Sequence, residues 1–182
     1  MKKVNIPTIF VVFGATGDLM NKKIVPALYL LWKGKLLPDN FRVLGISRQD
    51  MSDTAFRTYI GGIIKEKGKE TKKLDDFIEL FHFQAGDFNK AKTYSAIKKH
   101  LNTIEDEWKV CANKMYYLAV PPQFMDTIVV QLKKSGLSKP CGGPEGWARV
   151  MIEKPFGQDG NTAKSLEKTL AVFKEKQIYR ID

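Results

Sequence analysis

A glycine-rich turn near the amino terminus combines the residue types that bind phosphate groups. The apolar run IFVVF is followed by Gly14, Ala15, Thr16, Gly17, Asp18 and Leu19, where an amphipathic helical pattern begins. In such a strand–turn–helix unit, glycines let backbone N–H groups approach a pyrophosphate, and the helix dipole favours its negative charge. The turn therefore predicts a dinucleotide site. A glycine-bearing turn in an α/β protein without a nucleotide is the alternative.

One position close to this turn departs from the usual pattern. A small residue three positions beyond the second glycine often lets helix and strand pack closely. This chain has Met20 at that position, three residues beyond Gly17. Either the packing is looser there, or the methionine side chain points away from the strand.

The pair Ser47-Arg48 stands where the second expected strand, residues 41–47, ends. In dinucleotide-binding folds, an acid at this place holds the ribose 2′-hydroxyl of NAD, whereas an arginine accommodates the 2′-phosphate of NADP. A hydroxyl and a guanidinium both suit a phosphate. The pair predicts NADP as the cofactor. Asp50 is the competing acid, and an ordinary surface arginine is the other interpretation.

Two further motifs follow expected strands. The first, YLAVPP, begins at Tyr117 and contains Pro121, and it would form a wall beside the nicotinamide. Taken alone, a buried strand followed by a turn is the better interpretation of that motif. The second, EKPFG, follows the apolar segment RVMI, and the Lys154 ammonium would bind a substrate oxyanion or phosphate. A strand-end ion pair is the alternative for Lys154.

The elements that position these motifs alternate between strand-like and helix-like patterns, which is typical of a parallel sheet with helices on its faces. We expect strands at residues 8–13, 41–47, 81–85, 115–120, 148–153 and 177–181. We expect helices at residues 18–32, 74–80, 91–101, 124–134 and 161–176, and one more that Ser52 or Asp53 caps. The sequence thus predicts a Rossmann-type, doubly wound α/β fold with a mostly parallel sheet and helices on both faces.

The first of these helices contains a proline, so we expect a kink or a lost hydrogen bond at Pro26. The apolar residues Ile24, Ala27, Leu28 and Leu31 share one face at helical spacing and are expected to point inward.

The composition is that of an ordinary globular domain. A chain of 182 residues is long enough for one domain with a core, and its formal net charge of +10 suggests an anionic partner. Phosphorylated ligands, nucleic acid and acidic surfaces qualify, and a solvated lysine-rich surface is the alternative. Cys111 and Cys141 form no zinc-type spacing, so we expect reduced thiols and no bound metal. We find no signal peptide or membrane-spanning run and expect a cytoplasmic protein.

These motifs together resemble those of one enzyme family. The segments GATGDL, Ser-Arg, YLAVPP, EKPFG and the final IYRID occur in the order and approximate spacing of glucose-6-phosphate dehydrogenase, and the resemblance covers the whole chain. It implies NADP-dependent oxidation of the C1 hydroxyl of glucose 6-phosphate to 6-phosphogluconolactone, with formation of NADPH. This reaction belongs to the oxidative pentose phosphate pathway of carbohydrate metabolism.

The resemblance also implies residue roles. The turn from Gly14 to Asp18 is similar to the pyrophosphate-binding turn, and Arg48, assisted by Ser47, to the 2′-phosphate ligand. Tyr117 and the two prolines after it resemble the cofactor-side wall. Lys154 is similar to the lysine that contacts both substrate and cofactor. Asp182 resembles the aspartate that orients a general-base histidine.

The sequence departs from the family at its end. In the family the final motif continues into a histidine-containing segment that binds the sugar phosphate, whereas this chain stops at Asp182. Its two histidines, His82 and His100, match no catalytic position and are expected to be structural or surface residues. We therefore interpret residues 1–182 as the NADP-binding domain, without the substrate domain, and expect cofactor binding without turnover.

Three other functions are compatible with parts of the sequence. A free-standing NADP-binding or regulatory module and a Rossmann sugar dehydrogenase with a similar Glu-Lys-Pro motif both fit the glycine turn; the final IYRID favours the first family. A nucleic-acid binder is the weakest, because the chain lacks a basic stripe interleaved with aromatic residues. Self-association into a homo-oligomer is left open.

Overall fold

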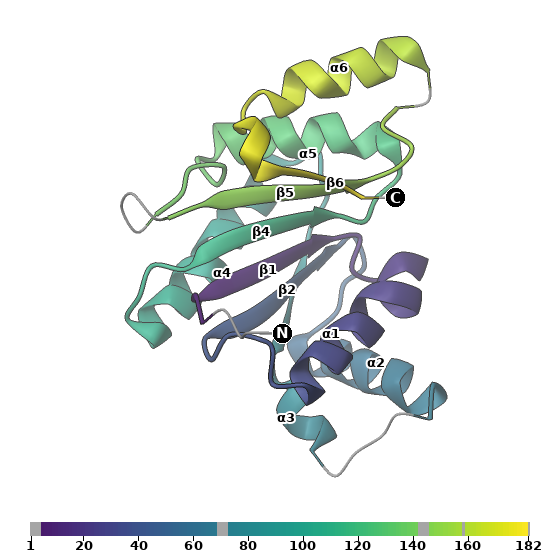
Figure 1. Cartoon of the computed structure of the whole chain (residues 1–182), viewed down its shortest axis with the longest axis vertical. Helices are drawn as coiled ribbons and strands as arrows, with labels where there is room; N and C mark the ends of the chain where they lie inside the picture. Colours follow the sequence, from purple (N-terminus) through teal and green to yellow (C-terminus); the bar gives the residue numbers. More distant parts are fainter. Residues whose placement is uncertain (1–4, 69–72, 142–145, 158, 182) are drawn as a thin grey trace.

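One parallel sheet organises the molecule. The computed structural model describes residues 5–68, 73–141, 146–157 and 159–181. Within these residues the sheet has six strands, all paired in parallel, in the order β3-β2-β1-β4-β5-β6 (Figure 1). The strands are β1 (Thr8–Phe13), β2 (Phe41–Ser47), β3 (Phe81–Ala85), β4 (Asn113–Leu118), β5 (Ala148–Glu153) and β6 (Ile178–Ile181). This order is that of a Rossmann-like fold and confirms the predicted fold class.

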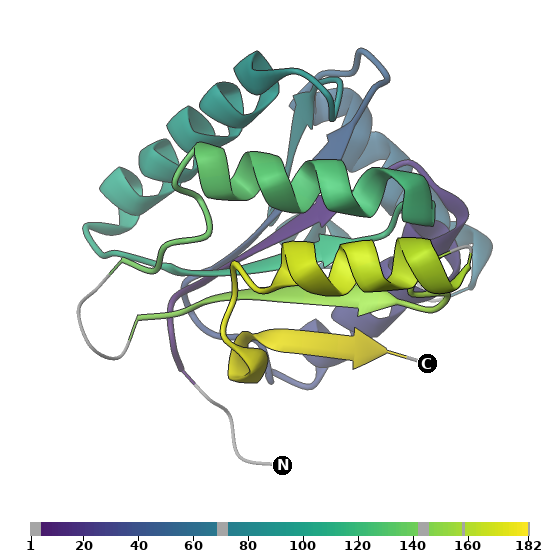
Figure 2. The ribbon, with the colours of Figure 1, turned by 90° about the horizontal axis from the view of Figure 1, so that it is seen from above.

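Helices connect the strands and cover the sheet in two groups. They are α1 (Val25–Lys33), α2 (Asp53–Glu66), α3 (Leu74–Ile78), α4 (Ala91–Trp108), α5 (Pro122–Lys134) and α6 (Gly160–Leu170), with the π-helix η1 (Met20–Ile24) and the 3₁₀-helix η3 (Glu175–Gln177). Figure 2 shows α5 and α6 lying side by side on one face. Buried residues of α4, α5 and α6 share one core cluster, and those of α1, α2 and α3 share the other.

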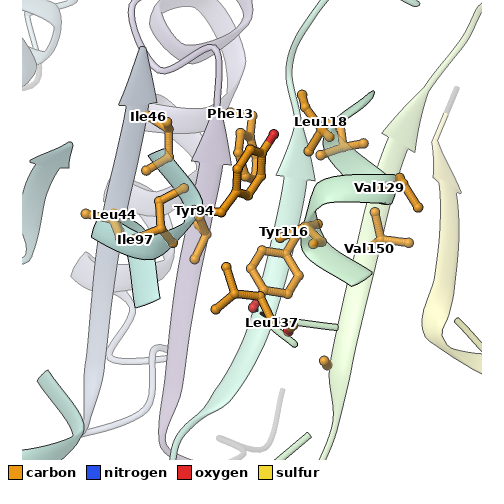
Figure 3. Close-up of a cluster of buried hydrophobic side chains, with 14 of the residues drawn as sticks. Phe13, Leu44, Ile46, Tyr94, Ile97, Tyr116, Leu118, Val129, Leu137 and Val150 are labelled. Atoms are coloured by element: carbon orange, nitrogen blue, oxygen red, sulfur yellow. Dashed lines mark hydrogen bonds between the residues drawn. The ribbon is translucent and has the colours of Figure 1, made fainter. Parts of the chain in front are cut away.

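The two-sided core explains why β1, in the middle of the sheet, is a continuous apolar run after Thr8. Strands buried on both faces need apolar residues at every position. In β1, Ile9, Val11 and Phe13 belong to the cluster under α4–α6, whereas Val12 belongs to the opposite one. Figure 3 shows the first cluster, where the aromatic side chains of Tyr94 and Tyr116 pack among aliphatic residues of the strands and helices.

The predicted bounds of β1, β2, β3 and β5 are confirmed. The prediction for β4 is wrong by two residues at each end, because Asn113 already pairs with Thr8 and the strand stops at Leu118. The helix after β3 continues to Trp108, since Ile104 extends its buried stripe. The last predicted helix ends early, at Leu170, because the chain turns back there to enter β6.

The first predicted helix is split at its proline. Residues Met20–Ile24 form a π-helix, and α1 begins directly afterwards with Pro26 in its first turn. Proline has no N–H group, so a regular hydrogen-bond ladder cannot run through it. The predicted inward face is partly wrong: Ala27 and Leu31 are exposed, and Val25 and Tyr29 are buried instead. The segment VPALYLLW is apolar almost throughout, so its periodicity does not define a single face.

The expectation of reduced thiols is also wrong. Cys111 and Cys141 are joined by a disulfide, with their Cα atoms 5.8 Å apart. Cys111 precedes β4 and Cys141 precedes β5, and these two strands are neighbours in the sheet. The loops at their amino ends therefore meet, although 30 residues separate the two cysteines in the chain. Separately, none of the helices among the described residues is long and apolar enough to cross a membrane.

Candidate functional site

Four of the sequence motifs meet at one edge of the sheet. The glycine turn follows β1, Ser47-Arg48 closes β2, the diproline follows β4, and Lys154 follows β5. All strands are parallel, so these carboxyl ends lie along the same edge, toward which the arrows in Figure 1 point. The strand order reverses between β1 and β4, and ligands of such sheets bind in the crevice at this reversal.

The glycine turn is pressed against the end of β4. Gly14 has a φ of 86°, and a Cβ atom added there would lie 2.2 Å from the carbonyl oxygen of Ala119. Only glycine fits this backbone and this contact. The N–H groups of Gly14 and Ala15 both donate to the carbonyl of Ile46, at 2.9 and 3.1 Å. These two residues therefore shape the turn and fasten it to β2.

A hydroxyl pair links the glycine turn to the end of β2. The side-chain oxygens of Thr16 and Ser47 are 2.8 Å apart and share a hydrogen bond. Ser47 is buried, and its hydroxyl also accepts a 3.4 Å hydrogen bond from the N–H of Gln49. No sequence pattern predicts this pair, which forms because β1 and β2 are neighbours in the sheet and their ends lie together. The pair fixes the backbone from which Arg48 projects.

Arg48 is exposed at the mouth of the crevice. Its guanidinium carbon lies 5.7 Å from the ring centre of Phe124, in the first turn of α5. The pKa of Asp87 is lowered, mainly by the hydrogen bond from the Asn89 N–H and to a small extent by the positive charge of Arg48. An aromatic ring beneath a guanidinium limits the positions that it samples. The competing acid, Asp50, is exposed as well.

The helical end of the turn has one exposed and two inward residues. Asp18 is exposed and forms a 2.6 Å ion pair with Lys22. Leu19 is half-buried and packs against the core cluster of α1–α3. Met20 is fully buried in the same cluster, so it does not point away from the fold. The turn therefore presents its polar backbone to solvent while its apolar side chains anchor it.

The β4–β5 half of the crevice is held by a tyrosine. Tyr117 is buried, and its hydroxyl donates a hydrogen bond to the carboxylate of Glu153. Burial raises the pKa of Tyr117, and the Glu153 carboxylate raises it further. The ring of Phe10 meets the Tyr117 ring edge-on at 5.8 Å. Beyond the strand, Pro121 is exposed and caps α5, where its carbonyl accepts the N–H of Phe124.

Lys154 is exposed just after β5, on the far side of the crevice from Arg48. Its backbone N–H donates to the carbonyl of Ile181 at 3.2 Å, which places it beside the end of β6. The ends of β2 and β5 are three strand spacings apart, about 14 Å. An exposed cationic residue thus follows a strand on either side of the reversal between β1 and β4. The predicted catalytic Asp182 lies outside the described residues.

The two histidines are not part of this crevice. His82 lies in β3 and His100 in α4, and their ring centres are 5.3 Å apart. The Nδ1 atom of His82 is 2.9 Å from Oδ2 of Asp53. β3 is the edge strand farthest from β5 and β6, so this group stands apart from Lys154.

Comparison with known proteins agrees with this geometry. Residues 11–182 match the family model described as the NAD binding domain of glucose-6-phosphate dehydrogenase. The chain is 35% identical over 175 residues to the glucose-6-phosphate 1-dehydrogenase of Bacillus subtilis, covering 96% of this chain and 35% of that protein. It is 36% identical over 179 residues to the enzyme of Ceratitis capitata, covering 98% of this chain and 33% of that protein. The chain therefore spans about a third of the length of these relatives.

Solved structures give the same result. A structure of glucose-6-phosphate dehydrogenase in complex with its substrate glucose-6-phosphate superposes with a TM-score of 0.85 at 30% sequence identity. That match covers 100% of this chain and 37% of the other. The glucose-6-phosphate 1-dehydrogenase of Mycobacterium avium gives a TM-score of 0.82 at 29% identity, covering 98% of this chain and 36% of that one.

Proposed function

The chain belongs to the glucose-6-phosphate dehydrogenase family, as its NAD(P)-binding domain, and we propose that its cofactor is NADP. The observation that carries the proposal is the end of β2, where Arg48 projects beside the Thr16–Ser47 hydroxyl pair. An arginine at this place suits a 2′-phosphate and offers no acceptor for the ribose hydroxyl of NAD.

The geometry supports a specific placement of the cofactor. In this placement the pyrophosphate lies beside Thr16, Asp18 and Leu19, because the N–H groups of Gly14 and Ala15 already donate to Ile46 and that of Gly17 donates to Gly14. The N-terminal end of the following helical segment adds its dipole to this site. The adenosine 2′-phosphate reaches Arg48, and the nicotinamide half extends toward β4, where Tyr117 supports the strand and Pro121 borders the crevice.

The reaction that we propose for the complete protein is oxidation of glucose 6-phosphate at C1, in the oxidative pentose phosphate pathway of the cytoplasm. When bound, NADP supplies the hydride acceptor. In this proposal Lys154 binds both the substrate and the cofactor, because it projects after β5 at the nicotinamide end of the crevice. Asp182 orients the general base that takes the C1 hydroxyl proton. The relative solved with glucose-6-phosphate supports this substrate.

Calorimetric titration of the 182-residue chain with NADP and with NAD tests the cofactor proposal. We expect NADP to bind at least about tenfold more tightly, the lower end of what one charged hydrogen bond contributes. Equal affinities, or tighter binding of NAD, would overturn the assignment of Arg48 as the 2′-phosphate ligand. Titration with inorganic pyrophosphate as competitor separates binding at the turn from binding at Arg48.

A further inference from the structure

Three metal-binding side chains converge at the free edge of the sheet, on residues that the proposed function does not use. Asp53 starts α2, His82 lies in the edge strand β3, and His100 lies in α4. One ligand atom from each of the three lies within 4.8 Å of the other two. We propose that Asp53, His82 and His100 form a binding site for a divalent transition-metal ion, with Zn²⁺ as the ion that fits best.

The spacing of the two rings matches shared coordination. Zinc–nitrogen bonds of about 2.0–2.1 Å at a tetrahedral ion place two imidazole ring centres about 5 Å apart. The ring centres of His82 and His100 are 5.3 Å apart, with planes inclined by 75°. Oδ2 of Asp53 already lies 2.9 Å from Nδ1 of His82, so small side-chain rotations bring all three ligand atoms around one ion.

The donor set selects the class of metal. Two imidazole nitrogens and one carboxylate oxygen suit Zn²⁺ and its first-row neighbours, whereas Mg²⁺ and Ca²⁺ prefer oxygen ligands throughout. Three protein ligands leave a fourth tetrahedral position for water. The side chains of His82 and Asp53 are 19% and 36% exposed, so an ion can reach the site from solvent.

The surroundings orient the ligands. The backbone N–H of Phe83 donates to Oδ1 of Asp53 at 2.8 Å, which turns Oδ2 toward His82. Such outer contacts fix the ligands of natural metal sites.

The guanidinium of Arg57 lies near Asp53 and reduces, without cancelling, the attraction of that carboxylate for a metal ion. Nη2 of Arg57 is 4.0 Å from Oδ2 of Asp53. Its Nε donates to the carbonyl of Phe81 at 2.9 Å, which holds the guanidinium along the strand edge. The negative charge of Asp53 is therefore shared between Arg57 and the proposed ion.

The expected consequence is structural. The ion would join α2 and α4 through the edge strand β3, which contacts both helices. An ion that binds the folded chain and not the unfolded one raises the midpoint of thermal unfolding. The alternative is that the three side chains only hydrogen-bond and pack, and this is one outcome of the test.

The test uses the full chain without a polyhistidine tag, freed of metal and kept under non-reducing conditions. Titration with ZnCl₂ should show one ion per chain, and Co²⁺ should give the visible absorption bands of a tetrahedral or five-coordinate ion. The chain has only two histidines, so Zn²⁺ should shift both sets of imidazole NMR signals in the unaltered protein. No uptake of Zn²⁺, or uptake that leaves these signals unchanged, would overturn the proposal.

Variants locate the ion. His82→Gln and His100→Gln should each weaken Zn²⁺ binding by about tenfold or more. Asp76→Asn removes an exposed carboxylate of α3 and should leave Zn²⁺ binding unchanged. Zinc affinity that survives both histidine changes would refute the site. All titrations omit NADP, so their outcome is independent of the cofactor proposal.

Discussion

The hydroxyl of Tyr117 donates a hydrogen bond to the carboxylate of Glu153, and this contact ties β4 to β5 at the crevice. The two residues lie 36 positions apart in the chain. The ring of Tyr117 is buried and its hydroxyl is hydrogen-bonded within the sheet, so the role of Tyr117 is to hold β4 in place beside β5. The strand that carries the diproline and the strand that carries Lys154 are held in one geometry by this pair.

Replacing Tyr117 by phenylalanine should therefore destabilise the chain. The change removes one hydrogen bond to a charged group, so the free energy of unfolding should fall by about 1–3 kcal/mol. Urea denaturation followed by circular dichroism measures it. Tyr179→Phe is the matched control, since Tyr179 is 40% exposed in β6 and should change stability little. Equal effects of the two substitutions would contradict the role given to the Tyr117–Glu153 contact.

Gly14→Ala should remove cofactor binding. An alanine Cβ would collide with the Ala119 carbonyl oxygen, 2.2 Å away, and would be strained at a φ of 86°. We expect a loss of more than about 2 kcal/mol of stability and of measurable NADP binding. Gly62→Ala is the control: Gly62 lies inside α2 with nothing within 4 Å of the added Cβ, so stability should rise by about 0.5–1 kcal/mol. Unchanged NADP affinity in Gly14→Ala would refute this account of the turn.

Arg48→Ala should weaken the binding of NADP and leave the binding of NAD nearly unchanged. Loss of a charged hydrogen bond to the 2′-phosphate should weaken NADP by about 1.5–3 kcal/mol, and NAD should change little because it lacks that phosphate. Titration calorimetry with both dinucleotides gives the difference. Lys98→Ala removes an equal charge from an exposed position on α4 and should leave both affinities unchanged. A parallel loss of NADP and NAD affinity in Arg48→Ala would count against the 2′-phosphate contact.

The buried tyrosines should make the fold lose stability at alkaline pH, as their hydroxyls ionise. The hydroxyls of Tyr94 and Tyr116 donate to the carbonyls of Phe88 and Leu137, and burial raises the pKa of both. Their contribution to stability is complete below the unfolded-state pKa of about 10 and is lost as the pH rises from there through the higher folded-state pKa. Tyrosinate absorbance should therefore appear in two steps, the second together with loss of the helical circular dichroism signal. Complete ionisation while that signal persists would show that these rings are not buried.

The 182-residue chain should not by itself reduce NADP with glucose 6-phosphate. Hydride transfer needs a general base beside the C1 hydroxyl. His82 lies in β3, four strand spacings or about 19 Å from β5, which precedes Lys154, and His100 lies beside His82 on α4. The assay is NADPH formation at saturating substrate and cofactor, with a full-length relative as positive control. Turnover that co-purifies with the chain and disappears in His82→Gln would show that a histidine of this chain is catalytic.

Local patterns in the sequence were enough to predict most of the strands and the order of the motifs. β1, β2 and β5 have the predicted bounds because each is a largely apolar run that ends at a glycine or a polar pair, and β3 because its apolar residues alternate with polar ones before a glycine. These signals are local, since strand propensity, burial on both faces and turn chemistry act over a few neighbouring residues. The parallel alternation and the motifs at the strand ends then placed the predicted site at one edge of the sheet.

Contacts between residues far apart in the chain depend on how the elements pack. The inward face of α1 depends on the sheet beneath it, because that segment is apolar on nearly every side. The Cys111–Cys141 disulfide and the Tyr117–Glu153 contact depend on β4 lying beside β5. The group of Asp53 and the two histidines depends on how α2 and α4 flank the edge strand. Strand order and helix packing arise from burial summed over the whole chain, so no local pattern encodes these contacts.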